Sequence, residues 1–160
     1  MSYKGSDYEP VYRWGYYAAI ACIVLTVAVF QPFAKPEPVN SRAYGCYTAA
    51  DAPSIRLDNN GMAIMQKSFA VIKFHLERHK TGITLTADAP IQADANGGSY
   101  VYSMYHPGIG SFLNFYRDDA GHRYDVFDET QLTSFTMLAR DGNEISYVKA
   151  GAGDCVTRES

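Results

Sequence analysis

The sequence predicts an all-β fold, in which one N-terminal transmembrane helix is followed by a small antiparallel β-barrel. Three observations lead to this prediction. Residues 14–34 form an apolar run without a charged side chain. After it, turn signals rich in Gly, Asn and Asp alternate with short segments rich in Tyr, Phe, Val, Ile and Thr. Two cysteines, Cys46 and Cys155, lie near the two ends of this second region.

Length and charge limit the range of functions. A chain of 160 residues has room for one domain and an anchor. From residue 36 onward, 11 Lys and Arg face 15 Asp and Glu, a net charge of −4, and the basic residues are scattered singly. A surface that binds nucleic acid needs clustered Lys and Arg to neutralise phosphates. The composition therefore excludes nucleic acid as an expected partner.

The apolar run has the length of a membrane span. Its 21 residues (14 to 34) would extend about 30 Å as a helix, the thickness of the hydrocarbon layer. We expect residues 1–13 to form a short cytoplasmic tail. A buried core helix and a cleaved signal peptide are alternatives, but no small-x-small cleavage site follows the run directly. Aromatic rings suited to the membrane interface lie near its ends: Trp14, Tyr16, Tyr17, Phe30 and Phe33.

Small residues at the start of the run offer a second contact. Gly15 and Ala19 are four residues apart, a spacing that lets another helix approach closely. A helix–helix contact with a membrane partner is therefore an expectation.

The cysteines decide the expected orientation. Positive charges are balanced on the two sides of the run, so they do not orient it. A disulfide between Cys46 and Cys155 would persist only in an oxidising compartment. We therefore expect a single-pass protein of the inner (plasma) membrane with a cytoplasmic N-terminus. The alternative is a pair of free thiols in a cytosolic domain. The expected segments after the helix are a proline-rich linker at 35–42, a periplasmic or extracellular domain at 43–156 and a tail at 157–160.

The domain is expected to consist of ten short strands. An antiparallel barrel with its ends tied by a disulfide is the first prediction, because closure removes exposed strand edges. A β-sandwich is the second, and an α+β fold with a helix at 62–79 is the third. The predicted strands are 43–49, 53–58, 62–66, 69–79, 83–88, 99–105, 111–117, 122–127, 132–140 and 144–149.

Local motifs for catalysis are missing from the sequence. It has no phosphate-binding loop, dinucleotide fingerprint, serine elbow or haem motif. His75 and His79 lack a nearby third metal ligand, and the acidic segment 117–129 lacks the spacing of a calcium loop. We expect a non-enzymatic protein without cofactor or metal.

An anchored, motif-free aromatic domain suggests an accessory or assembly subunit that contacts a larger integral membrane complex. The expected contact loop is glycine-rich and flanked by aromatics: Tyr105, His106, Pro107, Gly108 and Gly110.

The alternative function is a binding module. Gly45-Cys46-Tyr47 resembles the opening of lipocalin-like barrels, although the tryptophan of that family is absent here. The resemblance implies a barrel interior that binds a small apolar or amphipathic ligand.

Overall fold

The computed structural model describes residues 9–30, 36–105, 108, 110–151 and 154–155. The chain divides into two units, residues 1–36 and 37–160, and each is described by itself. The first unit contains one helix, α1 (Glu9–Phe30). Its described side chains, residues 14–27, are all exposed, and Thr26 Oγ1 donates a hydrogen bond to the Cys22 carbonyl at 2.7 Å.

The expected transmembrane helix at residues 14–34 has no support from this structure. Within the parts of the chain that are described, no helix is both long enough and apolar enough to cross a membrane. Residues 31–34, Phe33 among them, lie outside the described part, as does the side chain of Phe30.

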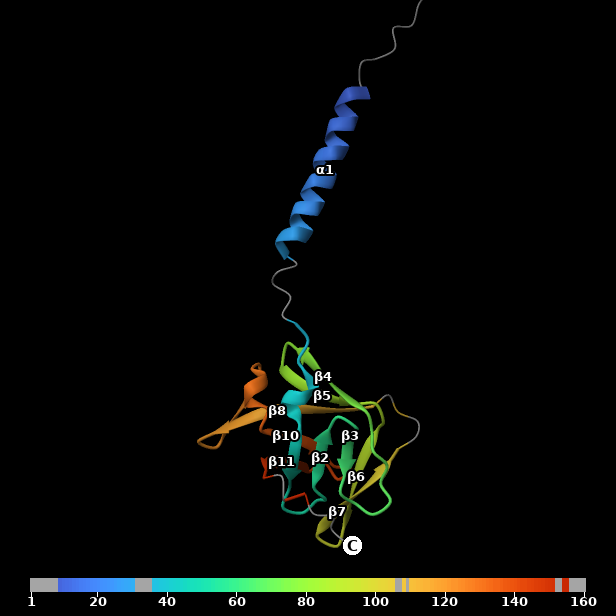
Figure 1. Cartoon of the computed structure of the whole chain (residues 1–160), viewed down its shortest axis with the longest axis vertical. Coiled ribbons are helices and arrows are strands. Elements are labelled where there is room, and N and C mark those ends of the chain that lie inside the picture. Colours follow the sequence, from blue (N-terminus) through green and yellow to red (C-terminus); the bar gives the residue numbers. More distant parts are fainter. Residues whose placement is uncertain (1–8, 31–35, 106–107, 109, 152–153, 156–160) are drawn as a thin grey trace, which may run out of the picture. The chain divides into compact units, whose positions relative to one another are not determined.

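The second unit is built from antiparallel β-strands and two short 3₁₀ helices (Figure 1). The helices are η2 (Asn40–Ala43) and η3 (Glu129–Gln131). The strands are β1 (Gly45–Thr48), β2 (Ile55–Asp58), β3 (Gly61–Ile64), β4 (Phe74–His79), β5 (Gly82–Ala87), β6 (Ile91–Asn96), β7 (Ser99–Met104), β8 (Ser111–Asp119), β9 (His122–Asp125), β10 (Ser134–Leu138) and β11 (Glu144–Ala150).

One sheet forms a nearly closed antiparallel barrel. Its strand order is β3-β2-β1-β11-β10-β8-β5-β4, and β9 pairs with β8 beside this path. The prediction of an all-β domain with a barrel is confirmed in this form, and the sandwich is not observed.

Two contacts close the seam between the ends of the sheet. Met62 in β3 exchanges both backbone hydrogen bonds with Ile72, at 2.7 and 3.0 Å. Farther along, the side-chain amide of Asn40 takes the place of a strand on the edge of β4. Its Oδ1 accepts from Leu76 N at 2.9 Å and its Nδ2 donates to Phe74 O at 3.4 Å. Two backbone groups on the edge of β4 are thereby satisfied without another strand.

The β6–β7 hairpin packs onto this barrel through both of its edges. On one edge, Tyr100 N donates to Asp51 O at 2.7 Å, and on the other Arg140 N donates to Ala93 O at 2.9 Å. Ala93 and Tyr102 belong to the buried core. The hairpin is therefore a structural part of the barrel core.

Aromatic rings fill the barrel interior. Tyr47, Phe115, Phe135 and Tyr147 are each fully buried. Phe135 lies at the centre of this group, with ring centroids 5.0 Å from Tyr47, 5.6 Å from Phe115 and 5.1 Å from Tyr147. Such packing of large rings stabilises the domain by burying apolar area.

The strand predictions held with three corrections. Each of the ten predicted segments contains a strand, but β6 was not predicted. The helix considered at 62–79 is wrong, because this stretch holds β3 and β4. Within it, residues 69–73 are not a regular strand as predicted, and only Ile72 forms a bridge.

Candidate protein-docking site

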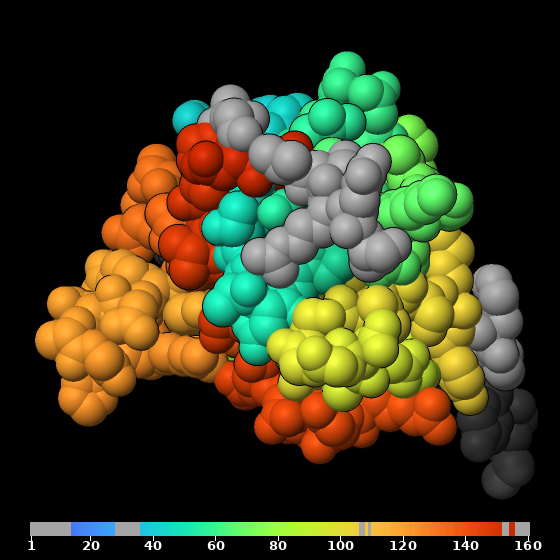
Figure 2. All heavy atoms as spheres, turned by 90° about the horizontal axis from the view of Figure 1, so that it is seen from below, coloured from blue at the N-terminus to red at the C-terminus, as the bar shows by residue number. Residues whose placement is uncertain are grey.

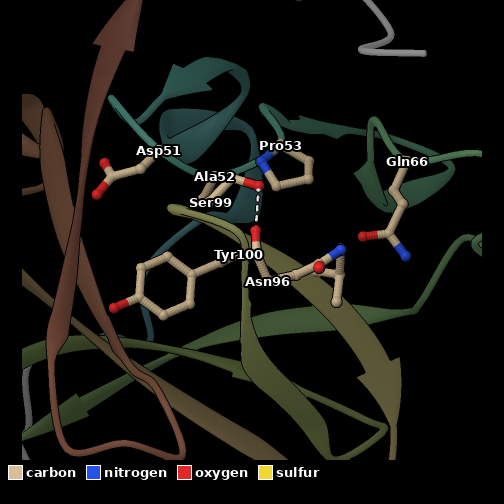
Figure 3. Close-up of a pocket in the computed structure, with 8 residues that line it drawn as sticks. Asp51, Ala52, Pro53, Gln66, Asn96, Ser99 and Tyr100 are labelled. Atoms are coloured by element: carbon tan, nitrogen blue, oxygen red, sulfur yellow. Dashed lines mark hydrogen bonds between the residues drawn. The ribbon is translucent and has the colours of Figure 1, made fainter. Parts of the chain in front are cut away.

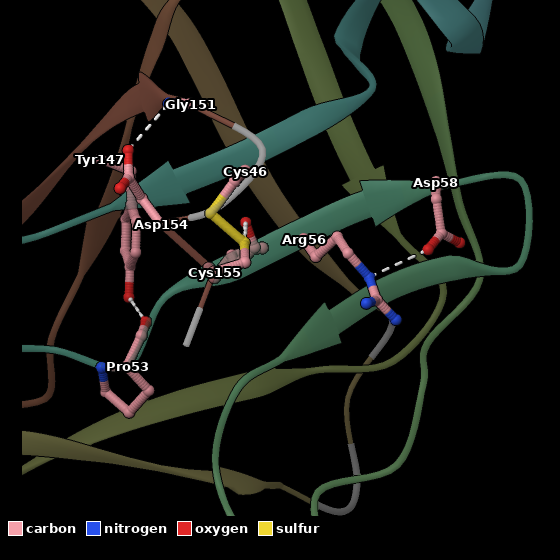
Figure 4. The surroundings of a disulfide bond; sticks show 9 residues. Cys46, Pro53, Arg56, Asp58, Tyr147, Gly151, Asp154 and Cys155 are labelled. Atoms are coloured by element: carbon pink, nitrogen blue, oxygen red, sulfur yellow. Dashed lines mark hydrogen bonds and ion pairs between the residues drawn. A yellow bond between two sulfur atoms is a disulfide. The ribbon is translucent and has the colours of Figure 1, made fainter. Parts of the chain in front are cut away.

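The predicted disulfide is present. Cys46 in β1 is bonded to Cys155, which follows β11, with their Cα atoms 5.5 Å apart (Figure 4). The bond covers Cys46, whose side chain points away from the barrel interior, and ties the two ends of the domain together. On the neighbouring strand β2, Arg56 and Asp58 form an ion pair at 3.1 Å.

The predicted contact loop lies close to the barrel wall where it is described. Tyr105 is exposed, and its backbone N donates to Pro90 O at 3.0 Å. A Cβ at Gly108 would come within 2.7 Å of the Pro90 side chain. Gly110 has φ +117°, a backbone conformation that favours glycine. His106 and Pro107 lie outside the described residues.

A second element projects from the domain and was not singled out from the sequence. The hairpin formed by β8 and β9 extends beyond the body of the domain (orange in Figures 1 and 2). Residues 117–125 are all exposed. β8 pairs with β10 only at Phe115 and Tyr116, so its last three residues pair with β9 alone.

Arg123 connects one face of this hairpin to strand β11 of the barrel. Arg123 forms an ion pair with Glu144, and its Nη2 donates to Ser146 Oγ at 2.9 Å. Its guanidinium also lies 4.7 Å from the centre of the Tyr116 ring. Both Glu144 and Ser146 belong to β11, so this arginine limits the movement of the hairpin relative to the barrel.

The opposite face of the hairpin carries a free arginine and a tyrosine. Arg117 and Tyr124 are cross-strand partners, and the guanidinium lies 5.8 Å from the ring centre. Tyr124 is 49% exposed. In the described structure, Arg117 has no carboxylate within ion-pair distance, unlike Arg56, Arg78, Arg123 and Arg140. Tyrosine and arginine are among the side chains most enriched at the energetic centres of protein interfaces.

The tip of the hairpin holds an unusual backbone. Ala120 has φ +52° and Gly121 has φ +82°, as a two-residue type I′ turn requires. An alanine in this region costs about 1 kcal/mol relative to glycine or asparagine. Strain of this kind is often found at functional elements.

The paired histidines lie on the solvent face of β4. Glu77 lies between them and binds both: His75 Nε2 is 2.8 Å and His79 Nε2 is 2.9 Å from its carboxylate oxygens. The hydrogen bond with His75 is the main cause that lowers the pKa of Glu77. Among the described residues, no group of three or more His, Cys, Asp or Glu is arranged to hold a metal ion.

Two hollows in the surface are small. One of about 80 Å³ lies between the β6–β7 turn and residues 51–53 (Figure 3). Ser99 Oγ donates to Asn96 O at its rim, at 3.0 Å. The other, of about 200 Å³, lies beside the disulfide. Both are below the volume of about 300 Å³ from which small-molecule pockets generally start.

The aromatic residues between positions 102 and 127 divide between core and surface. Tyr102 and Phe115 are buried, whereas Tyr105, Phe112, Tyr124 and Phe127 are about half exposed. The exposed rings, together with the projecting hairpin, make a protein-binding surface the best-supported site. No family model, curated protein or solved structure matches this chain, so the site is interpreted from its own residues.

Proposed function

We propose that this protein is a membrane-anchored accessory subunit whose β domain docks onto a larger membrane protein complex. The single observation that carries the docking proposal is the β8–β9 hairpin. It projects from the barrel, exposes Arg117 and Tyr124, and is held in place by Arg123. The exposed part of the hairpin, residues 117–125, contributes little burial to the fold, so a binding role explains it better than a structural one.

The anchor part of the proposal rests on the sequence. The uncharged run continues from Trp14 to Ala34, beyond the last described residue of α1. The described side chains of residues 14–27 are exposed on every side of α1, and a helix that is apolar all round needs a cover of lipid or protein.

The filled interior favours docking over the carrier function. A lipocalin-like module needs a cavity of several hundred Å³. Here Tyr47, Phe115, Phe135 and Tyr147 occupy the interior of the barrel. The disulfide also supports placing the domain in an oxidising compartment, periplasmic or extracellular.

The anchor can be tested with the cysteine in α1. Cys22 is a free thiol, and the other two cysteines are bonded to each other, so a maleimide reports on α1 alone. We expect the full chain to stay in the membrane pellet during alkaline carbonate extraction. We also expect Cys22 to be protected from an impermeant maleimide until detergent is added. Release into the supernatant together with immediate labelling would contradict the anchor.

Docking can be tested by affinity purification of the full chain from native membranes in mild detergent. We expect a membrane protein to co-purify in fixed stoichiometry with the native chain and with Tyr105→Ser. The double variant Arg117→Ser/Tyr124→Ser should lose most of it. A chain that purifies alone as a single species would overturn the proposed function.

A further inference from the structure

We propose that Arg117 and Tyr124 form the energetic centre of the docking surface and bind a carboxylate on an acidic segment of the partner protein. This inference rests on the proposed function and names the chemistry of the partner. It is carried by the position of Arg117, whose guanidinium lies over the Tyr124 ring without a carboxylate partner among the described residues.

The first step of the argument concerns charge. Arg56 is paired with Asp58, Arg78 with Glu129, Arg123 with Glu144, and Arg140 with Asp94. Among the described residues, Arg42 and Arg117 have no ion pair, and Arg117 differs from Arg42 because its guanidinium lies over the face of the Tyr124 ring. Its planar fork of N–H donors matches the two oxygens of a carboxylate. A carboxylate from another protein would form an ion pair with Arg117, as Glu144 does with Arg123.

The second step concerns preorganisation. Arg117 and Tyr124 are direct partners across two paired strands, so their Cα atoms are fixed by the β8–β9 ladder. The contact with the ring, 5.8 Å from the guanidinium to the ring centre, favours the rotamers that place the charge over the ring. A partner therefore meets a side chain that loses little further freedom on binding, which favours affinity.

The third step concerns the surroundings of the pair. Residues 117–125 are exposed, so the pair is accessible from the solvent, and Tyr124 offers apolar ring area beside the charge. Phe127, three residues farther along the chain, is also 49% exposed. An arginine without a carboxylate partner beside an exposed ring fits an acidic protein segment with apolar neighbours. Scattered basic residues make an anionic lipid surface a poorer match.

The experiment uses the full-length chain in native membranes with a photo-crosslinking benzoylphenylalanine at position 124 or, as a control, at position 105. We expect a crosslink from position 124 to a segment of another protein that contains Asp or Glu, identified by mass spectrometry. Arg117→Glu should reduce this adduct at least tenfold, because it places like charges together. Arg117→Lys should reduce it less, because the charge is kept while the planar fork is lost.

Arg140→Glu is the matched control, because Arg140 is exposed and its ion-pair partner, Asp94, lies outside the hairpin. It should leave the adduct unchanged. The inference fails if the adduct resists Arg117→Glu, if Arg140→Glu weakens it equally, or if position 124 crosslinks to lipid or to a second copy of this chain. A crosslink from position 105 alone would also overturn it, while leaving the proposed function standing. If no adduct forms and the chain purifies alone, both the inference and the proposed function are contradicted.

Discussion

The side-chain amide of Gln66 binds both backbone polar groups of Tyr102. Its Nε2 donates to Tyr102 O at 2.8 Å, and its Oε1 accepts from Tyr102 N at 2.8 Å. This is the bonding that a neighbouring strand would supply to the edge of β7. Asn40 likewise binds two backbone groups on the edge of β4, but these belong to two residues, Phe74 and Leu76.

Replacement of Gln66 should therefore destabilise the domain. Gln66→Ala removes both bonds and leaves the Tyr102 N–H and C=O without partners, at an expected cost of about 1–3 kcal/mol in the free energy of unfolding. Gln66→Glu keeps the acceptor for Tyr102 N but places a carboxylate oxygen against the Tyr102 carbonyl. It should therefore restore little of the lost stability. Urea denaturation of the isolated domain measures both. Equal stability of Gln66→Ala and the native domain would contradict this role.

The hydroxyls of Tyr102 and Tyr147 should contribute unequally. They lie 2.6 Å apart, and Tyr147 also donates to Pro53 O at 2.9 Å. Burial raises the pKa of both groups, so both stay neutral. Tyr102→Phe leaves the Tyr147 bond to Pro53 intact. Tyr147→Phe leaves two buried polar groups unpaired, so it should cost about 1 kcal/mol more. Thermal unfolding of the single and double variants gives this difference, and a larger loss for Tyr102→Phe would refute it.

Reduction of the disulfide should lower stability markedly. The bond joins residues separated by 109 positions. On the chain-entropy model a loop of that size corresponds to roughly 4–5 kcal/mol. We expect Cys46→Ser/Cys155→Ser to match the reduced native domain in urea midpoint, with both well below the oxidised domain. The free thiol Cys22 is absent from the isolated domain and does not interfere. An unchanged midpoint after complete reduction would be the contrary result.

Relief of the strained turn should stabilise the hairpin. Asparagine tolerates the positive φ of residue 120 better than alanine, and Asn-Gly is a preferred type I′ pair. Ala120→Asn should therefore raise the free energy of unfolding by about 0.5–1 kcal/mol. Ala120→Val should lower it, because a branched side chain fits this region poorly. Calorimetry of the three proteins checks the order, and a stabilising Val would contradict the assigned backbone.

Acid sensitivity should depend on Asp128. Its Oδ1 accepts from Thr130 N at 2.9 Å at the start of η3. That bond is the main cause holding the pKa of this carboxyl below its ordinary value of 3.8. Because the folded value is the lower one, the contribution is present above pH 3.8 and is lost as the pH falls further. Asp128→Asn keeps an acceptor without a charge, so its melting temperature should fall less between pH 5 and pH 2.5. An equal fall in melting temperature for Asp128→Asn and the native protein would refute this.

The sequence allowed most strands to be placed but not all of their partners. Turn signals and alternating apolar residues located the ten predicted segments, because both follow from local chemistry. β6 was missed because Gln92, Asp94 and Asn96 give it little β-propensity. Tertiary bonds, such as that from Arg140 N to Ala93 O, hold it instead. The roles of Asn40 and Gln66 were hidden for the same reason, since an amide gives no local sign of its partner.

The candidate site was harder to predict than the fold. The acidic segment 117–129 lacks the spacing of a calcium loop, and the structure places a hairpin turn there, at Ala120 and Gly121. Its projection depends on β8 being nine residues long while β10 pairs with only two of them. The pattern of apolar residues does not show that paired strands differ in length. The sequence therefore predicted a contact at the loop 105–110 instead.

The disulfide also has a mechanical consequence. β1 is an interior strand of the sheet, between β2 and β11. A pulling force that enters along the N-terminal segment first loads the two bonds of Asn40 to β4, and then the hydrogen bonds on both sides of β1 together. At Cys46 the load passes through a covalent bond to Cys155 beyond β11. A domain tethered at its N-terminus and gripped at the β8–β9 hairpin should therefore resist tension without peeling apart strand by strand.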